Sequence, residues 1–213
     1  MTITILDLVH LAFTRAKSDL YSDYERWIST SYKLGSALPN SLMVKRVQEL
    51  GELDLVLRGI ESELIHHAKE AGFKIEIYFT LSRVWVSTAY EIFRRLKGIV
   101  DGQIRQEVFE IERELKLVRV PLEKHEIAED RKFGRTLILS PQLRHEDGND
   151  KDMTYDPSDV KKSFIPPTTL SNRGSEIWIV PDARTGGNRM VERQGLSDRI
   201  LGFGMSNVST AKG

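Results

Sequence analysis

The chain has 213 residues with 31 basic and 31 acidic side chains, so its formal net charge is zero, and it contains no cysteine. The length suits one domain, or one domain with a smaller appendage, and the lack of cysteine excludes a disulfide framework, a thiolate metal site and a cysteine nucleophile. The balanced charge argues against constitutive binding of a polyanion, because proteins that bind nucleic acid usually carry a basic excess.

Residues 2–30 carry apolar side chains three or four positions apart, which predicts one amphipathic helix. Its stripe includes Tyr21, Tyr24 and Trp27, which could stack on bases, but such stripes more often lie in a core. Asp7 interrupts the apolar start, and no basic region precedes it, so we expect no signal peptide. No stretch reaches the roughly 18 uncharged apolar residues typical of a membrane span, so we expect a cytoplasmic protein without a membrane partner.

Two further helices follow. The first is expected to start at an N-cap at Asn40 or Ser41 and to end at Gly72, and Gly51 and Gly59 are candidate points of close helix contact. Residues 73–78 alternate apolar and polar side chains and predict a short strand or an extended linker. The next helix is expected over 80–99.

The last long helix is predicted over 104–118, where a strict spacing of four and three residues makes a narrow apolar seam that is a candidate dimer surface. Pro121 is expected to end it near Val118 or Arg119, and a short helix is expected over 122–131. Amphipathic helices with short connections predict an antiparallel helical bundle over residues 1–133.

Beyond Gly134 the pattern becomes that of strands. Short β-rich runs at 135–140, 175–180 and 189–193, with a hairpin turn at 185–188, predict a small antiparallel sheet. Residues 142–173 are polar and rich in charge, and we expect a flexible loop. A short helix at 196–203 ends the fold. The predicted fold is thus mostly α, a bundle at 1–133 followed by a small β-hairpin appendage at 134–213.

One stretch carries candidate chemistry. Arg119 and His125 have five residues between them and lie late in the predicted bundle. This spacing resembles the Arg-x4–6-His signature of the HEPN superfamily, whose members are helical bundles. The resemblance covers residues 1–133. It implies a metal-independent endoribonuclease of the toxin or defence type that works as a homodimer, with RNA as substrate or an antitoxin as partner, and with no cofactor.

The two side chains are chemically suited to a metal-independent ribonuclease. Cleaving RNA without metal requires a base for the ribose 2′-hydroxyl and an acid for the leaving oxygen, for which an imidazole is suited, and a guanidinium can hold the phosphate. We assign Arg119 and His125 as candidate catalytic residues, and Lys124, Glu126 and Glu91 as candidates for substrate binding. No metal ligand is assigned.

A non-catalytic alternative fits the same residues. Arg119, Glu123 and His125 would then form a polar network that caps the junction of two helices, and Glu123 and Glu126 would add negative charge where an RNA backbone should approach. In that reading the chain is a helical protein-interaction module, with its β hairpin as a contact edge or a cover.

Overall fold

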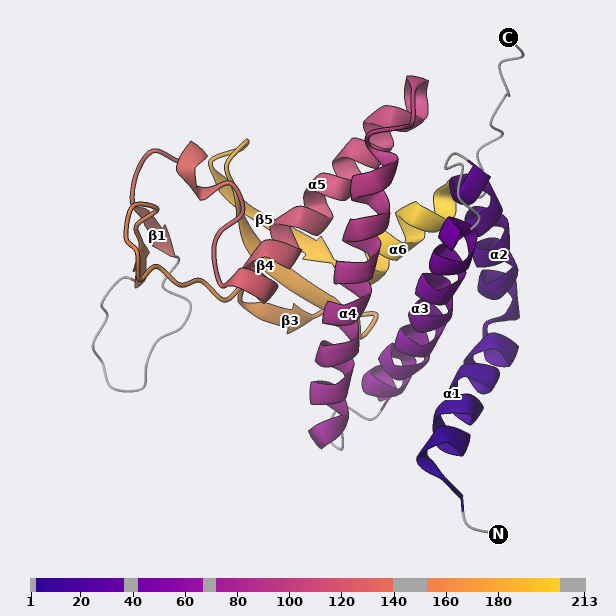
Figure 1. The fold of residues 1–213 in the computed structure, drawn as a ribbon. Coiled ribbons are helices and arrows are strands. Elements are labelled where there is room, and N and C mark those ends of the chain that lie inside the picture. The colour runs from indigo at the N-terminus through magenta and orange to yellow at the C-terminus, as the bar shows by residue number, and fades with distance from the viewer. Residues whose placement is uncertain (1–2, 37–41, 67–71, 140–152, 204–213) are drawn as a thin grey trace.

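The computed structural model describes residues 3–36, 42–66, 72–139 and 153–203. Over these ranges the chain forms six α-helices and two small antiparallel sheets (Figure 1). The predicted fold class, a helical bundle followed by a small antiparallel sheet and a short helix, is therefore confirmed. The helices are α1 (Ile5–Asp19), α2 (Tyr21–Ser36), α3 (Leu42–His66), α4 (Gly72–Leu96), α5 (Gly102–Lys124) and α6 (Arg193–Gly202). The strands are β1 (Leu137–Leu139), β2 (Met153–Tyr155), β3 (Thr168–Leu170), β4 (Glu176–Asp182) and β5 (Gly187–Glu192).

The first predicted helix is in fact two helices. Thr4 begins α1 with a capping box, in which its hydroxyl accepts from the Asp7 N–H at 3.2 Å and the Asp7 carboxylate accepts from the Thr4 N–H at 2.8 Å. The helix ends at Leu20, whose backbone leaves the helical region with φ −116° and ψ 41°. Its N–H still bonds to the Ala16 carbonyl, so the side-chain periodicity continues across the break and conceals it.

The contact between α2 and α3 depends on a glycine. A Cβ added at Gly51 would lie 2.5 Å from the Trp27 ring, whereas one at Gly59 would meet nothing within 4 Å. Trp27 is buried, and its indole N–H donates to Asp54 Oδ2 at 3.0 Å. Gly51 is therefore the point of close helix contact that the sequence predicted, and Gly59 is not.

Helix α4 contains residues 73–78, so the prediction of a strand or linker there was wrong. Tyr78 lies in this segment and is fully buried. Its hydroxyl donates to Glu61 Oε1 and accepts from the Glu176 N–H, both at 2.7 Å. The alternating pattern is compatible with either structure, and these tertiary contacts are satisfied by the helix.

Helix α5 continues through Pro121 to Lys124, so the predicted end near residue 118 and the short helix at 122–131 were wrong. Proline in the last turn removes a single backbone hydrogen bond, and the Pro121 carbonyl still accepts from the His125 N–H at 3.0 Å. The chain then folds back through a 3₁₀ turn, Asp130–Lys132. The apolar seam of α5 is buried inside the chain itself, so it offers no dimer surface: Val108, Ile111, Leu115 and Val118.

The C-terminal sheet has the strand order β3-β4-β5. The predicted hairpin is present, with β4 and β5 joined through the turn that follows Asp182. Part of the predicted loop at 142–173 is structured, because β2 pairs with β1 and β3 pairs with β4. Residues 142–152 of that loop lie outside the described residues.

One hydrophobic core includes residues from both sides of the predicted boundary at 134, with Trp27 and Trp85 from the bundle and Trp178 from the sheet. Arg193, at the start of α6, is fully buried against α3. Its Nη1 lies 2.5 Å from Asp54 Oδ1 and its Nη2 lies 2.7 Å from Glu61 Oε2. This buried ion cluster ties α6 and the sheet to the bundle.

Candidate functional site

Arg119 lies on α5 and is held by carboxylates. Its Nε donates to Glu123 Oε1 at 3.0 Å, and its Nη2 lies 2.8 Å from Glu123 Oε2 and 3.7 Å from Glu91 Oε1 on α4. The guanidinium also lies over the Tyr90 ring, 4.6 Å from its centroid. A bidentate carboxylate pair together with an aromatic face satisfies most of what a guanidinium can bind, so a phosphate would have to displace Glu123.

His125 ends α5 in the left-handed backbone region, with φ 56°. Its backbone is fully used, since its N–H donates to the Pro121 carbonyl and its own carbonyl accepts from the Phe164 N–H at 2.8 Å. The imidazole is exposed and has no hydrogen bond, ion pair or ring contact with any other part of the chain that the structure describes. The left-handed backbone therefore turns the chain back while leaving the ring in solvent.

The remaining predicted site residues are only partly brought together. Glu91 reaches Arg119, but its closer partner is Arg94 at 2.8 Å, whose hydrogen bond lowers the pKa of the Glu91 carboxyl. Lys124 is exposed and Glu126 is half-buried, and the described structure contains no contact between either of them and Arg119. The Arg119–Glu123 pair of the non-catalytic alternative is present, with Ser87 of α4 also donating to Glu123 at 2.6 Å, and His125 lies outside this network.

Helix α1 carries an unexpected apolar surface. The sequence predicted an apolar face along this part of the chain, yet among the described residues of α1 only Ala16 is buried. Five large aliphatic side chains are exposed by about half or more, and they are named here the α1 surface: Ile5 (81%), Leu6 (79%), Leu8 (54%), Val9 (48%) and Leu11 (60%). Figure 1 shows this half of α1 at the edge of the bundle. The periodicity that predicted a core face did not distinguish packing inside the chain from packing against another molecule.

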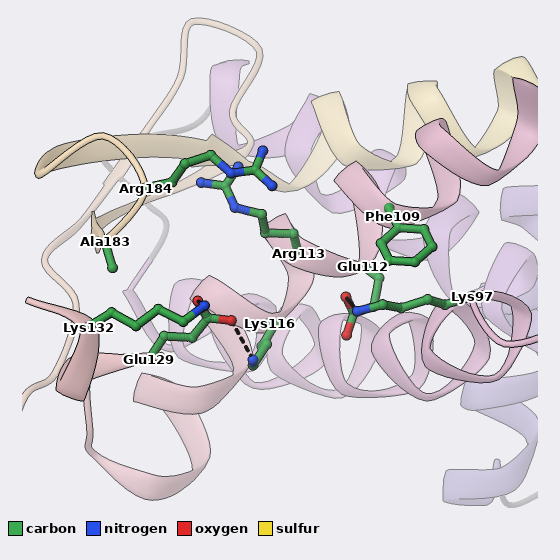
Figure 2. Close-up of a pocket in the computed structure, with 9 residues that line it drawn as sticks. All are labelled: Lys97, Phe109, Glu112, Arg113, Lys116, Glu129, Lys132, Ala183 and Arg184. Carbon is green, nitrogen blue, oxygen red and sulfur yellow. Dashed lines mark hydrogen bonds and ion pairs between the residues drawn. The ribbon is translucent and has the colours of Figure 1, made fainter.

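A second feature that sequence reasoning missed is a cavity of about 290 Å³ between α5, the 3₁₀ turn and the β4–β5 turn, named here the cationic cleft. Figure 2 shows its two walls, with the guanidinium groups of Arg113 and Arg184 on one and Lys116, Glu129 and Lys132 on the other. Lys97, Phe109, Glu112 and Ala183 complete the lining. The five cations come from positions 97 to 184, and a run of basic residues in the sequence, the usual signal for such a site, is absent.

Within the described ranges, no group of three or more histidine or acidic side chains is placed to hold a metal ion. None of the helices described there combines the length and apolarity that a bilayer span requires. No protein-family model, curated protein or solved structure matches this chain.

Proposed function

We propose that this chain is a non-catalytic helical interaction module that associates with a second copy of itself through the α1 surface. The observation that carries the proposal is the exposure of five large aliphatic side chains within seven consecutive residues, 5–11. Single exposed apolar side chains are common on protein surfaces, but contiguous apolar patches usually mark a contact with another molecule. Burying such area stabilises a complex by roughly 25 cal/mol per Å² before the entropy of association is subtracted.

A second copy is the favoured occupant because the apolar residues of the α1 surface can pack against the same residues of another copy. The charged groups at its two ends are engaged within the chain, since the Asp7 carboxylate accepts from the Thr4 N–H at 2.8 Å and Lys17 Nζ lies 2.6 Å from Glu52 Oε1, so the contact depends on the apolar side chains. Two α1 helices packed antiparallel around an axis near Leu8 would place the apolar residues 5–11 of each against those of the other. Such an isologous contact closes as a two-fold dimer. The proposal also keeps the cytoplasmic location expected from the sequence.

The double variant Leu8→Lys/Leu11→Lys tests this surface. Wild-type protein is expected to sediment at twice the chain mass, and the variant at the chain mass with an unchanged circular dichroism spectrum, because both side chains are exposed. Val160→Lys is the matched control, since Val160 is an aliphatic residue that is 98% exposed outside α1. Analytical ultracentrifugation measures the outcome. A wild-type monomer, or a double variant that still dimerises, would contradict the proposal.

The second candidate is the metal-independent ribonuclease, and the specific observation in its favour is the exposed imidazole of His125, which has no partner in the described structure. A free imidazole can transfer protons near neutral pH. Against it stands Arg119, whose guanidinium is engaged by Glu123 and by the Tyr90 ring. We therefore rank this candidate below the interaction module.

Incubating purified protein with total RNA, with and without a chelator, separates the two candidates. The interaction module predicts no loss of RNA at high protein concentration. The ribonuclease predicts cleavage that resists the chelator and is abolished by His125→Ala, with the fold unchanged. His10→Ala is the control, because His10 is also exposed but lies on α1. Cleavage that both variants retain would come from a contaminant. It would not support catalysis by His125.

A further inference from the structure

The cationic cleft gathers like charges from distant parts of the chain. Arg113 and Lys116 come from α5, Lys132 from the 3₁₀ turn, Arg184 from the β4–β5 turn, and Lys97 from the residue after α4. Bringing five cations to one concavity is electrostatically unfavourable unless negative charge compensates them. Concave walls of low dielectric also focus the resulting field on whatever anion enters.

Few carboxylates neutralise these five cations. Glu129 serves two ammonium groups, Lys116 at 2.7 Å and Lys132 at 2.5 Å, and their hydrogen bonds lower the pKa of its carboxyl to about 2. Glu110 likewise serves two guanidinium groups, Arg113 at 3.4 Å and Arg184 at 2.9 Å. Sharing of one carboxylate between two cations leaves donors that a stronger anion can use.

Two further carboxylates pair with cations of the cleft. Glu112 pairs with Lys97 at 2.8 Å, and Asp182 pairs with Arg113 while also lying 3.9 Å from Arg189. Among the described residues, four carboxylates therefore pair with the five cations of the cleft, two of them are each shared between two of these cations, and Asp182 also lies near Arg189 outside the cleft. The cleft retains an excess of positive charge although the chain as a whole has none.

Glu129 occupies the place of an anionic ligand. It holds the left-handed backbone conformation, φ 59°, which is unfavourable for a residue with a side chain, and its carboxylate lies between two ammonium groups on one wall. We infer that the cationic cleft is a binding site for a small phosphorylated molecule, whose phosphate takes the position of the Glu129 carboxylate between Lys116 and Lys132 and reaches Arg184 on the opposite wall. A phosphate has more charge and more acceptor oxygens than a carboxylate, and so competes with it.

The size and shape of the cleft favour a small molecule. Its volume of about 290 Å³ is at the lower end of the range for ligand pockets, roughly 300–1,000 Å³. The outer cations are open to solvent, with the side chains of Lys132 and Arg184 exposed by 67% and 63%, whereas Arg113 is exposed by only 16%. This gradient gives a mouth with exposed cations and an inner end with a largely buried one. The half-buried Phe109 ring adds an apolar contact.

Calorimetric titration at constant ionic strength tests the inference, with inorganic pyrophosphate, inorganic phosphate and adenosine monophosphate as probes. We expect saturable binding of at least one of them. The variant Lys132→Met/Arg184→Met is expected to lower the affinity by about tenfold or more, without loss of fold, because both side chains are exposed. The matched control is Lys45→Met/Arg46→Met, an exposed pair on α3 that should bind like wild type.

Glu129→Gln supplies a prediction of opposite sign. Because the amide no longer neutralises Lys116 and Lys132, this variant is expected to bind the probe more tightly than wild type. Binding of pyrophosphate alone would assign an inorganic polyphosphate, and binding of adenosine monophosphate would assign a nucleotide-like molecule; both support the inference. It would be overturned by no binding of any of the three probes, by equal losses in the cleft variant and its control, or by weaker binding in Glu129→Gln.

Discussion

Replacing Arg193 with Met is expected to lower the free energy of unfolding by about 3–5 kcal/mol. The guanidinium is fully buried and is bonded to Asp54 and to both oxygens of Glu61. Methionine fills much of the same space, but it leaves two buried carboxylates without their shared cation. Asp54 keeps a second cation, Arg58, with Nε at 2.7 Å, whereas among the described residues Glu61 keeps the Tyr78 hydroxyl alone. Most of the loss therefore arises at Glu61, and urea unfolding followed by circular dichroism measures it.

A second substitution identifies the source of this loss. Adding Glu61→Gln to Arg193→Met removes the unpaired buried charge, so the double variant is expected to be more stable than Arg193→Met alone. Arg15→Met is the control, because its ion pair with Asp19 at 3.2 Å is exposed and should contribute less than about 1 kcal/mol. Equal losses at Arg15 and Arg193, or no recovery in the double variant, would show that the cluster does not tie α6 to the bundle.

The elements predicted well are those with local signals. The apolar spacing of α3, α4 and α5 and the hairpin of β4 and β5 depend on neighbouring residues only, so they could be predicted from the sequence, although the turn lies at 183–186 and not at the predicted 185–188. The errors arose where contacts between residues far apart in the sequence determine the local structure. Residues 73–78 are helical because Tyr78 joins Glu61 to Glu176, and Glu176 is 98 residues further along the chain. The break at Leu20 leaves the periodicity unchanged and so gives no signal.

In the candidate site, too, contacts between residues far apart in the sequence could not be predicted. The sequence placed Arg119 at the end of a long helix and His125 in a short helix after it, whereas Arg119 lies within α5 and His125 is the C-cap of that same helix. It could not indicate that Tyr90 and Glu91 of a different helix lie against the Arg119 guanidinium. The cationic cleft is assembled from four segments, and charge neutrality of the whole chain gave no reason to expect it. Both surfaces that carry proposals here thus depend on tertiary placement rather than on a motif.

The second large effect is expected from Glu176, the first residue of β4, as a dependence of stability on pH. Glu176 is 1% exposed, and its Oε2 has no hydrogen-bond partner in the described structure. Burial raises the pKa of its carboxyl from 4.5 to about 7, and the charge of Arg83 offsets this only in part. The Trp178 indole and the Ser82 hydroxyl also lower this pKa, but by less than burial raises it. The protonated acid is therefore the form that the folded state prefers.

The sign of the effect follows from proton linkage. Because the folded-state pKa is the higher one, the folded protein retains a proton that the unfolded chain releases above pH 4.5. The contribution of protonated Glu176 to the free energy of unfolding is present in full below pH 4.5 and is lost as the pH rises through 7. The difference between the two pKa values corresponds to about 3 kcal/mol. Wild-type protein should therefore be less stable at pH 8 than at pH 5 by an amount of this order.

Glu176→Gln separates this contribution from every other titration, because glutamine has nearly the shape of the protonated acid and does not ionise. The variant and wild type are expected to unfold at similar urea concentrations at pH 5, and the variant is expected to be more stable by about 2–3 kcal/mol at pH 8. Glu107→Gln on the exposed side of α5 is the control and should follow wild type at both values. A stability difference between Glu176→Gln and wild type that does not change with pH would mean that the Glu176 carboxyl is already ionised at pH 5 and that a donor or water compensates it. In that case the start of β4 would be held to the bundle by a charged group, and the pH dependence of the fold would have to arise elsewhere.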